Sequence, residues 1–456
     1  MNFKQLNTVY FIGVGGIGMS AIARYFLSLN KQVYGYDKTP NEFTYLLEKE
    51  GMIIHYHEDI KSIPEQVYEE EQSLVIYTPA IPSNHAELVH LKSKNIRVYK
   101  RAEILGLISK NTYTIAVAGT HGKTTTSCLI AHLLHSNGIN FTGFLGGISS
   151  NYQSNFIEYK KGKELFDMPI SVVEADEYDR SFLQLSPNVS IITSTDADHL
   201  DIYGEAEKVK SSFQSFVECL LPNGHAIIKQ GLDLTCPYNL ITYGYQNNSG
   251  ASYQNVNIVD HKFNFEFSYL HHAMNLKMGL PGLHNVENAT AAIVVALLLG
   301  IEPQGIMNAI ETFKGVKRRF DYIVNNEKGI YIDDYAHHPT ELTACINSVK
   351  MMYPNKKITG IFQPHLFSRT RDFADDFAES LNLLDECWLL DIYPARELPI
   401  EGITSEYLAL KMNSNVCLTT NTEILKKLKE NKPEVLLTLG AGDIDKLIQP
   451  IKDLYA

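Results

Sequence analysis

The sequence predicts an α/β protein with parallel sheets, divided into three domains. Short apolar runs alternate with segments of helical pattern along most of the chain, which is typical of strands and helices in βαβ units. Two glycine-rich loops, at residues 13–18 and 119–122, each follow an apolar run and precede a helix. A length of 456 residues exceeds that of one ordinary domain. We expect domains at residues 1–108, 109–316 and 317–456.

The composition excludes several classes of function. Forty Lys and Arg residues against 52 Asp and Glu give a net charge of −12, which argues against general binding of nucleic acid or an anionic membrane. Six cysteines without a C-x-x-C pair indicate reduced thiols rather than disulfides or a zinc site. No apolar run reaches the roughly 18 residues that a membrane span needs. We therefore expect a cytoplasmic protein without nucleic-acid or membrane partners.

The first block has the pattern of a Rossmann-like domain. A strand at Thr8–Ile12 leads into the loop Gly13–Gly18, and a helix follows from about Met19. A second strand, Gln32–Tyr36, ends at Asp37, about 20 residues after the glycines. A glycine loop of this kind binds a dinucleotide or the diphosphate of a nucleotide that does not react. A nicotinamide-dependent dehydrogenase is therefore one alternative hypothesis.

The second block carries the strongest signal, a phosphate-binding loop of the P-loop ATPase type. The strand Thr112–Ala118 is followed by Gly119-Thr-His-Gly-Lys-Thr-Thr-Thr126 and a helix over Thr124–Ser136. Glycines let backbone amides approach phosphate oxygens, and the helix N-terminus favours negative charge. Lys123 would contact the β- and γ-phosphates, and the Thr124 hydroxyl would contact Mg²⁺. The general pattern has a glycine where this chain has Val117, so the loop is a variant.

Two acidic segments follow buried strands in the same block. Glu174 and Asp176 come after the strand Ile170–Val173, where Mg²⁺ finds oxygen ligands beside a phosphate loop. His199, flanked by carboxylates, comes after the strand at residues 189–193 and is a candidate metal ligand or base. The stretch 238–269, rich in tyrosine and asparagine, predicts short antiparallel strands.

A helix at residues 285–299 ends the second block, and the third block alternates again. Asn285 and Asn288 are three residues apart, so their amides face one side of this helix. In the third block we expect strands at 329–333, 358–362, 387–390 and 435–439, each ending in a polar or glycine loop. Arginines at 317–320 can neutralise charge on a transferring phosphoryl group, and Arg369 can bind a carboxylate. The C-terminal domain is therefore also predicted to be Rossmann-like.

The ordered set of motifs resembles the Mur ligases of peptidoglycan synthesis. The motifs are GVGGIGMS, AGTHGKTTT, EADEYD, DADHLD, HNVENATAA, GVKRRF, DDYAHHPTE, FQPHLFSRT and GAGDI, and they cover nearly the whole chain. The resemblance implies a UDP-sugar-binding N-terminal domain, a central ATP-binding domain and a C-terminal ligase domain. It also implies an activity, the ATP-dependent ligation of L-alanine to the carboxylate of UDP-N-acetylmuramate through an acyl phosphate.

The resemblance assigns roles to individual residues. Those expected to take part in catalysis are Lys123, Glu174, His199 and Arg319, and the metal ligands, for Mg²⁺ or Mn²⁺, are Thr124, Glu174 and His199. ATP would be bound by Gly119, Thr120, Gly122, Lys123, Thr124, Thr125, Asn285, Asn288, Arg319 and Asp334. The UDP-sugar would be bound by Gly15, Gly16, Ile17, Gly18, Met19, Ser20, Asp37, Thr78, Ala80 and His121. The amino acid would be bound by Tyr335, His337, His365 and Arg369.

Two positions depart from patterns within the family. Ser194 stands where an asparagine is usual, and Phe213 stands where relatives that add later residues carry a modified lysine. The second departure favours the branch that adds L-alanine. The alternatives are a recycling ligase that adds a tripeptide to the same sugar, and a UDP-sugar sensor that does not hydrolyse ATP. The sequence leaves open a monomer or a homodimer.

Overall fold

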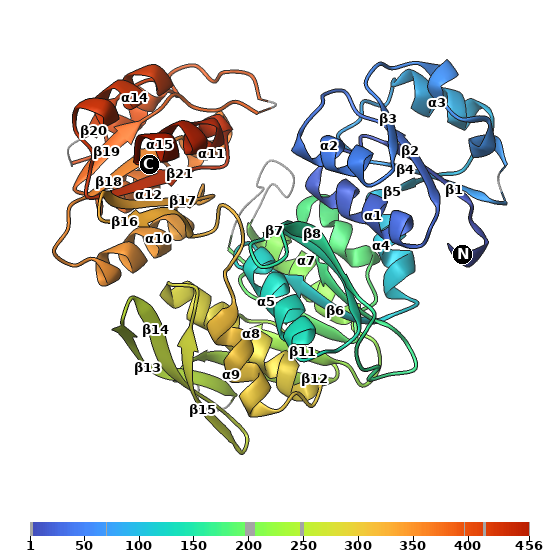
Figure 1. The fold of residues 1–456 in the computed structure, drawn as a ribbon, viewed down its shortest axis with the longest axis horizontal. Coiled ribbons are helices and arrows are strands. Elements are labelled where there is room, and N and C mark those ends of the chain that lie inside the picture. The colour runs from blue at the N-terminus through green and yellow to red at the C-terminus, as the bar shows by residue number, and fades with distance from the viewer. Residues whose placement is uncertain are drawn as a thin grey trace. The chain divides into compact units, whose positions relative to one another are not determined.

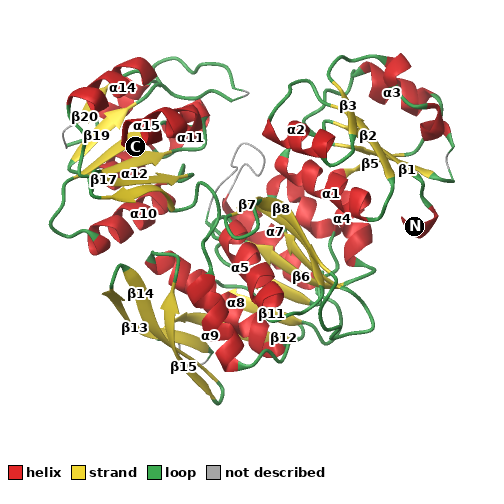
Figure 2. Ribbon diagram, in the orientation of Figure 1, coloured by secondary structure: helices red, strands yellow, loops and turns green. Residues whose placement is uncertain are grey.

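The computed structural model of the protein describes residues 3–69, 71–196, 206–246, 250–395, 397–413 and 416–455. These residues form two compact units, Met1–Ser252 with Thr290–Ala309, and Tyr253–Ala289 with Ile310–Ala456. Within the described ranges the strands form three sheets, and helices pack against them (Figures 1 and 2). The prediction of an α/β protein with parallel sheets is confirmed, while the predicted domain boundaries stay predictions.

The N-terminal sheet of the first unit is wholly parallel. Its order is β3 (Ile53–His55), β2 (Gln32–Tyr36), β1 (Thr8–Ile12), β4 (Ser73–Tyr77) and β5 (Val98–Lys100). Its helices are α1 (Ile17–Ser28), α2 (Glu42–Lys49), α3 (Ala86–Ser93) and α4 (Arg101–Ser109), with short 3₁₀ turns at Phe3–Gln5, Ile60–Ser62 and Glu65–Tyr68. The strand order reverses between β1 and β4. The loops after these two strands therefore border the crevice in which such sheets bind ligands.

The central sheet of the first unit places the phosphate loop between two acidic loops. Its order is β12 (Asn239–Tyr245), β11 (His225–Lys229), β10 (Val189–Ile192), β6 (Tyr113–Ala118), β9 (Ile170–Glu174), β7 (Phe141–Ser149) and β8 (Ser154–Tyr159). Only β8 runs antiparallel to its neighbour here. Helices α5 (Lys123–Ser136) and α7 (Ala206–Glu218) and the 3₁₀ segment Tyr178–Gln184 complete this part. Because β10, β6 and β9 are parallel neighbours, the loops after them meet at one edge.

The N-terminal and central parts of the first unit share one apolar core. Helix α1 contacts β7 and β8, and Phe26 on α1 is fully buried. The rings of Tyr25 and Phe144 lie 5.5 Å apart, in the range of favourable aromatic pairs. The glycine loop before α1 is thereby fixed relative to the central sheet.

A buried asparagine on β8 completes this contact with α1. Asn155 donates from Nδ2 to the Ile17 carbonyl at 2.6 Å and to the Ser20 hydroxyl at 3.0 Å. Its Oδ1 accepts from the guanidinium of Arg24, which also binds Glu50 with two hydrogen bonds. One amide therefore satisfies three polar groups that the apolar core would otherwise leave unpaired.

The second unit contains antiparallel strands and the C-terminal sheet. The strands are β13 (Ala251–Val259), β14 (Lys262–Tyr269) and β15 (His272–Met278). The helices α8 (Leu283–Leu298) and α9 (Pro303–Thr312) follow them in the chain, and most of both helices belongs to the first unit. The C-terminal sheet has the order β16 (Asp321–Asn326), β17 (Gly329–Asp334), β21 (Val435–Leu439), β18 (Ile358–Phe362), β19 (Glu386–Leu389) and β20 (Val416–Leu418). All neighbours except β16 and β17 are parallel.

The remaining helices of the second unit accompany the C-terminal sheet. They are α10 (Pro339–Met352), α11 (Phe367–Asp372), α12 (Ala374–Leu381), α13 (Ser405–Ala409), α14 (Asn421–Glu430) and α15 (Ile448–Tyr455), with a 3₁₀ turn at Asp443–Leu447. A core of Tyr331, Trp388 and Leu436 with its neighbours lies between the strands and helices α14 and α15.

One prediction about the stretch 238–269 is wrong in part. Strands β14 and β15 are antiparallel, but β12 pairs parallel with β11. An alternating apolar pattern indicates a strand with one exposed face and does not specify the direction of its neighbour. All six cysteines are free thiols, as predicted. No described helix is both long and apolar enough to span a membrane.

Asn155→Ala tests the contact between α1 and β8. We expect the free energy of unfolding to fall by about 1–3 kcal/mol, because the variant leaves buried polar groups without partners. Denaturant unfolding followed by circular dichroism measures this. Gln66→Ala removes an exposed amide of the same unit and is expected to change stability by less than about 0.5 kcal/mol. An Asn155→Ala variant as stable as this control would contradict the assignment.

Candidate active site

The phosphate-binding loop has the predicted strand–loop–helix context. Strand β6 continues through Val117 to Ala118, which explains why the expected first glycine is absent from position 117. Gly119 and Gly122 have φ angles of +137° and +82°, a region that side chains avoid. A Cβ atom at Gly119 would lie 2.1 Å from the Thr193 hydroxyl oxygen. The backbone at this position is therefore open only to glycine, and it brings the loop against the segment after β10.

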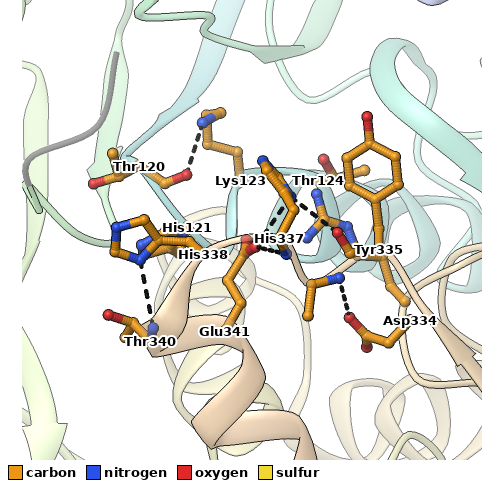
Figure 3. A network of polar contacts seen from close by, with 12 residues as sticks. Thr120, His121, Lys123, Thr124, Asp334, Tyr335, His337, His338, Thr340 and Glu341 are labelled. Atoms are coloured by element: carbon orange, nitrogen blue, oxygen red, sulfur yellow. Dashed lines mark hydrogen bonds and ion pairs between the residues drawn. The ribbon is translucent and has the colours of Figure 1, made fainter. Parts of the chain in front are cut away.

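Lys123 begins α5 and lies within the loop that precedes it. Its ammonium group donates to the carbonyl oxygens of Gly119 and Thr120 and lies 2.8 Å from the Glu177 carboxylate (Figure 3 shows the contact with Thr120). Burial lowers the pKa of Lys123, but the charges of Glu177 and Glu174 outweigh it, so the pKa stays above its usual value. Lys123 is therefore cationic at neutral pH.

Glu177 was not among the predicted site residues. It is 2% exposed, and burial raises its pKa to about 7 even though the charge of Lys123 opposes this. The sequence contained a signal for it: a buried loop lysine needs a carboxylate nearby, and the acidic segment after β9 offers several.

Glu174, at the end of β9, lies beside the start of α5 as predicted. Its Oε1 accepts a hydrogen bond from the Thr124 hydroxyl at 3.1 Å, and its Oε2 accepts one from the Gly146 amide at 2.9 Å. A Cβ atom at Gly146 would lie 2.2 Å from the carboxylate, so Glu174 needs a glycine at this position of β7. Two of the three predicted metal ligands are thus adjacent oxygen donors.

The loop after β10 contacts the other side of the phosphate loop. Ser194 accepts from the His121 amide at 2.7 Å and donates to the Thr120 hydroxyl at 3.1 Å, while Thr193 donates to the Ala118 carbonyl. The serine that departs from the family pattern therefore supports the loop backbone. The imidazole of His121, a predicted UDP-sugar ligand, faces the Asp196 carboxylate at 3.4 Å.

The third predicted metal ligand, His199, lies outside the described residues. Among the residues that the structure does describe, no group of three His, Cys, Asp or Glu side chains has metal-binding geometry. The roles of Thr124 and Glu174 in metal binding stay predictions.

The N-terminal glycine loop lies at the switch point between β1 and β4. Asp37 accepts from the Gly15 amide at 2.7 Å and from the Thr39 amide at 3.1 Å, so both carboxylate oxygens bind the protein backbone. The methyl group of Thr78 approaches Gly13 so closely that a Cβ atom there would lie 2.5 Å from it. Asp37 thus stabilises the loop, whereas the dehydrogenase hypothesis needs it for a ribose.

A pocket of about 320 Å³ opens next to this loop within the first unit. Its lining includes the predicted UDP-sugar ligands Gly16, Ile17, Gly18, Met19 and Thr78, and also Gly146, Glu174, Asp176 and Arg101. The predicted UDP-sugar and metal residues therefore border one pocket. Of the other predicted UDP-sugar ligands, Ser20 is buried against Asn155, and the amide of Ala80 bonds to the Thr78 hydroxyl.

Arg101 is a second residue that the motifs did not reveal. It is the first residue of α4, and its guanidinium lies 2.8 Å from Asp176. A cation at a helix N-terminus opposes the helix dipole. An arginine at the start of a helix was therefore the feature of the sequence that could have indicated a special role.

In the second unit, the predicted ATP ligands are mostly buried. Asn285 and Asn288, in the first turns of α8, are 2% and 6% exposed, and Asn285 donates to the Pro281 carbonyl. Asp334 accepts from the amides of Phe320 and Ala336, both at 2.7 Å. Burial raises the pKa of Asp334 to about 6, against the charge of Arg319. Asp334 thus fixes the backbone at the end of the arginine segment and just after β17.

The predicted amino-acid ligands form a row of rings in the second unit. The rings of Tyr335 and His337 lie 5.1 Å apart, and those of His337 and His365 lie 6.1 Å apart. Arg369, on the short helix α11, is 6% exposed. The structure therefore brings together side chains that the sequence separates by some 30 residues.

Glu341, on α10, contacts both a predicted ATP ligand and a predicted amino-acid ligand of the second unit. Its carboxylate lies 3.4 Å from Arg319. It also accepts from the His337 amide at 3.1 Å (Figure 3). Arg318, by contrast, binds the buried Asp333 at 3.1 Å and the Gly440 carbonyl at 2.8 Å. The structure thus separates the adjacent arginines, with Arg318 in a structural contact and Arg319 beside Glu341.

Comparison with known proteins identifies the family. Three family models match successive parts of the chain: "Mur ligase family, catalytic domain" at residues 8–113, "Mur ligase middle domain" at 117–296 and "Mur ligase, glutamate ligase domain" at 318–442. A relative from Cytophaga hutchinsonii, a UDP-N-acetylmuramate--L-alanine ligase, is 46% identical over 99% of this chain and 97% of its own. The chain belongs to the Mur ligase family.

Further relatives of this Mur ligase have the same name. The UDP-N-acetylmuramate--L-alanine ligase of Christiangramia forsetii is 48% identical over 98% of each chain. Among solved structures, the UDP-N-acetylmuramate-alanine ligase MurC from Thermotoga maritima matches with a TM-score of 0.80 and 28% identity, over 98% of this chain and 99% of that one. A murein peptide ligase from Psychrobacter arcticus, at 21% identity and a TM-score of 0.70 over 98% of both chains, shares the fold. The chain has the three-domain architecture of these ligases.

Gly146→Ala tests the position of Glu174 in this Mur ligase. We expect the new methyl group to displace the flexible Glu174 side chain from Thr124, so that Mg²⁺-dependent ATP turnover falls about tenfold or more while the melting temperature changes little. Gly143→Ala, on the same strand, is the matched control, because a Cβ atom there has no neighbour closer than 3.3 Å. Equal activity of the two variants would contradict a role for the Glu174 position.

Proposed function

We propose that this Mur ligase forms an amide bond between L-alanine and the carboxylate of UDP-N-acetylmuramate, with hydrolysis of ATP to ADP and phosphate. The relatives that match it from end to end at 46–48% identity have the name of this activity. One structural observation supports the chemistry: the acidic segment Glu174–Glu177 contacts both the phosphate loop and the pocket beside the N-terminal glycine loop.

The residues present fit ATP as the phosphoryl donor. Gly119 and Gly122 have φ angles that glycine alone adopts without strain, and the N-terminus of α5 has no acidic residue in its first turn. Lys123 supplies the positive charge for the β- and γ-phosphates. A fold neighbour, MurF from Thermotoga maritima, was solved in complex with ADP. We propose that Asn285, Asn288 and Arg319 bind the rest of the nucleotide.

The residues also fit a divalent cation of the Mg²⁺ type. The Thr124 hydroxyl and the Glu174 carboxylate are adjacent oxygen donors, which this hard cation prefers. When bound, the cation would neutralise charge on the transferring phosphoryl group. We propose His199 as a further ligand.

The proposed reaction has two steps. In the first, a carboxylate oxygen of UDP-N-acetylmuramate forms a bond to the γ-phosphorus of ATP, the bond to the β-phosphate oxygen breaks, and ADP leaves. In the second, the amine nitrogen of L-alanine attacks the acyl carbon, loses a proton, and phosphate leaves with the former carboxylate oxygen. Lys123 stabilises negative charge in the first step. In the second unit, we propose that Arg369 binds the carboxylate of alanine and that Tyr335, His337 and His365 surround it.

A substrate assay tests the proposal directly. With ATP, Mg²⁺ and UDP-N-acetylmuramate, we expect phosphate release that requires an added amino acid, and L-alanine is expected to be the preferred one over glycine and serine. A tripeptide that replaces L-alanine as the better substrate would support the recycling ligase instead. No amino-acid-dependent phosphate release would reject the proposal.

Lys123 offers a sharper test, because its buried partner can be removed with it. Lys123→Met alone is expected to cost about 3–5 kcal/mol of stability, since it leaves Glu177 buried without its cation. The double variant Lys123→Met, Glu177→Gln removes both charges and is expected to regain most of that stability, but not turnover.

The control for this test is Lys161→Ala, which removes an exposed lysine of the same unit and is expected to leave turnover unchanged. Binding of UDP-N-acetylmuramate to the double variant, measured by calorimetry, is expected to match the unchanged protein. A double variant that retains turnover, or that is folded and loses UDP-sugar binding, would contradict the assignment of Lys123 to the phosphates of ATP.

A further inference from the structure

The chain that leads from the end of β18 into α11 carries two of the predicted amino-acid ligands, His365 and Arg369. Leu366, which lies between them, has a φ of +73° and a ψ of +136°, outside the regions that a leucine adopts freely. A strained backbone of this kind persists only where the surrounding structure holds it in place. The position of the His365 ring relative to the Arg369 guanidinium therefore depends on contacts that other segments make with this turn.

The segment after β19 supplies the first of these contacts. The Leu366 amide donates to the Tyr393 carbonyl at 2.9 Å, and the Tyr393 amide donates to the Pro364 carbonyl at 2.8 Å. The Tyr393 ring also stacks on the His365 ring, with centroids 5.7 Å apart and planes inclined by 22°. These backbone hydrogen bonds and the ring contact hold the side of the turn that contains His365.

Glu397, further along the same segment, holds the other side of the turn, where α11 begins. Its Oε2 accepts a hydrogen bond from the Ser368 amide at 3.0 Å, and its Oε1 accepts one from the Ser368 hydroxyl. Ser368 is the second residue of α11, and Arg369 follows it directly. Because a carboxylate that accepts from a first-turn amide stabilises the start of a helix, Glu397 fixes the part of α11 from which Arg369 projects.

We propose that Glu397 is a positioning residue for the amino-acid substrate and acts through Ser368 on Arg369. This inference rests on the proposed function, in which Arg369 binds the carboxylate of alanine. A guanidinium binds a carboxylate best through two parallel hydrogen bonds, which require a fixed direction of its planar fork. Arg369 is only 6% exposed, so its side chain has little room to compensate for a shift of the helix. Loss of Glu397 would release the first turn of α11 and weaken the contact with the substrate.

Steady-state kinetics of Glu397→Ala in the full chain test this proposal. We expect the KM for L-alanine to rise about tenfold, because a charge-assisted contact is weakened. The kcat at saturating alanine and the KM values for ATP and UDP-N-acetylmuramate are expected to change less than about twofold, as when binding alone is lost. Glu397→Gln keeps an acceptor for the Ser368 amide and is expected to retain most of the affinity for alanine. Glu401→Ala removes an exposed carboxylate of the same loop and is expected to change none of these values.

Two further variants test whether the effect passes through Ser368 and Arg369. Ser368→Ala removes one of the two hydrogen bonds to Glu397 and is expected to raise the KM for alanine about threefold, which covers the case in which Glu397→Ala does not fold. Arg369→Lys keeps the charge without the fork and is expected to raise this KM by itself. In the Arg369→Lys background, Glu397→Ala is expected to add less than about twofold, since both residues act through one contact.

Three results would overturn the proposal. They are a KM for alanine that is unchanged in Glu397→Ala and Ser368→Ala, a parallel rise of the KM values for all three substrates, and an effect of Glu397→Ala that multiplies fully with that of Arg369→Lys. Absence of amino-acid-dependent phosphate release from the unchanged protein would instead reject the ligase proposal, and this inference with it.

Discussion

The segment Glu174–Glu177 is the feature on which the rest of the site in the first unit depends. Its three carboxylates have three different partners: Glu174 contacts Thr124 and the Gly146 amide, Asp176 contacts Arg101, and Glu177 contacts Lys123. One turn of chain after β9 therefore sets the position of the phosphate-loop lysine, of the proposed metal ligand and of the arginine in the pocket beside the N-terminal glycine loop. Such placement is possible because β9 is the parallel neighbour of β6, so the ends of these strands meet at one edge of the sheet.

The burial of the pair Lys123 and Glu177 restricts where these two side chains can lie. Two opposite charges removed from water are stable only with good geometry, and removal of either one leaves an uncompensated buried charge. The 2.8 Å contact and the two carbonyl acceptors of Lys123 provide that geometry. The loop lysine is thereby held near the position where phosphate is expected, so little rearrangement of the side chain is needed when nucleotide binds.

Much of the fold and part of the site could be predicted from the sequence. Strands such as Thr8–Ile12, Gln32–Tyr36 and Val435–Leu439 were predicted with their observed bounds, because each is a short apolar run that ends in glycine or a polar residue. Gly119, Lys123 and Glu174 were found because local patterns carry their chemistry. Glu177, Arg101 and Glu341 were missed, since their importance depends on partners 54, 75 and 22 residues away, and pairing at such separations is decided by packing. The direction of β12 was missed for the same reason, because the pattern of a strand does not determine which strand pairs with it.

The central claim is that a carboxylate is activated by phosphorylation at this loop, and oxygen transfer tests it most directly. UDP-N-acetylmuramate labelled with ¹⁸O in its carboxylate can be incubated with ATP, Mg²⁺ and L-alanine, and the released phosphate analysed by mass spectrometry. The account predicts that each phosphate carries one oxygen from the labelled carboxylate, because that oxygen forms the bond to phosphorus. Unlabelled phosphate, released together with the amide product, would contradict an acyl-phosphate route.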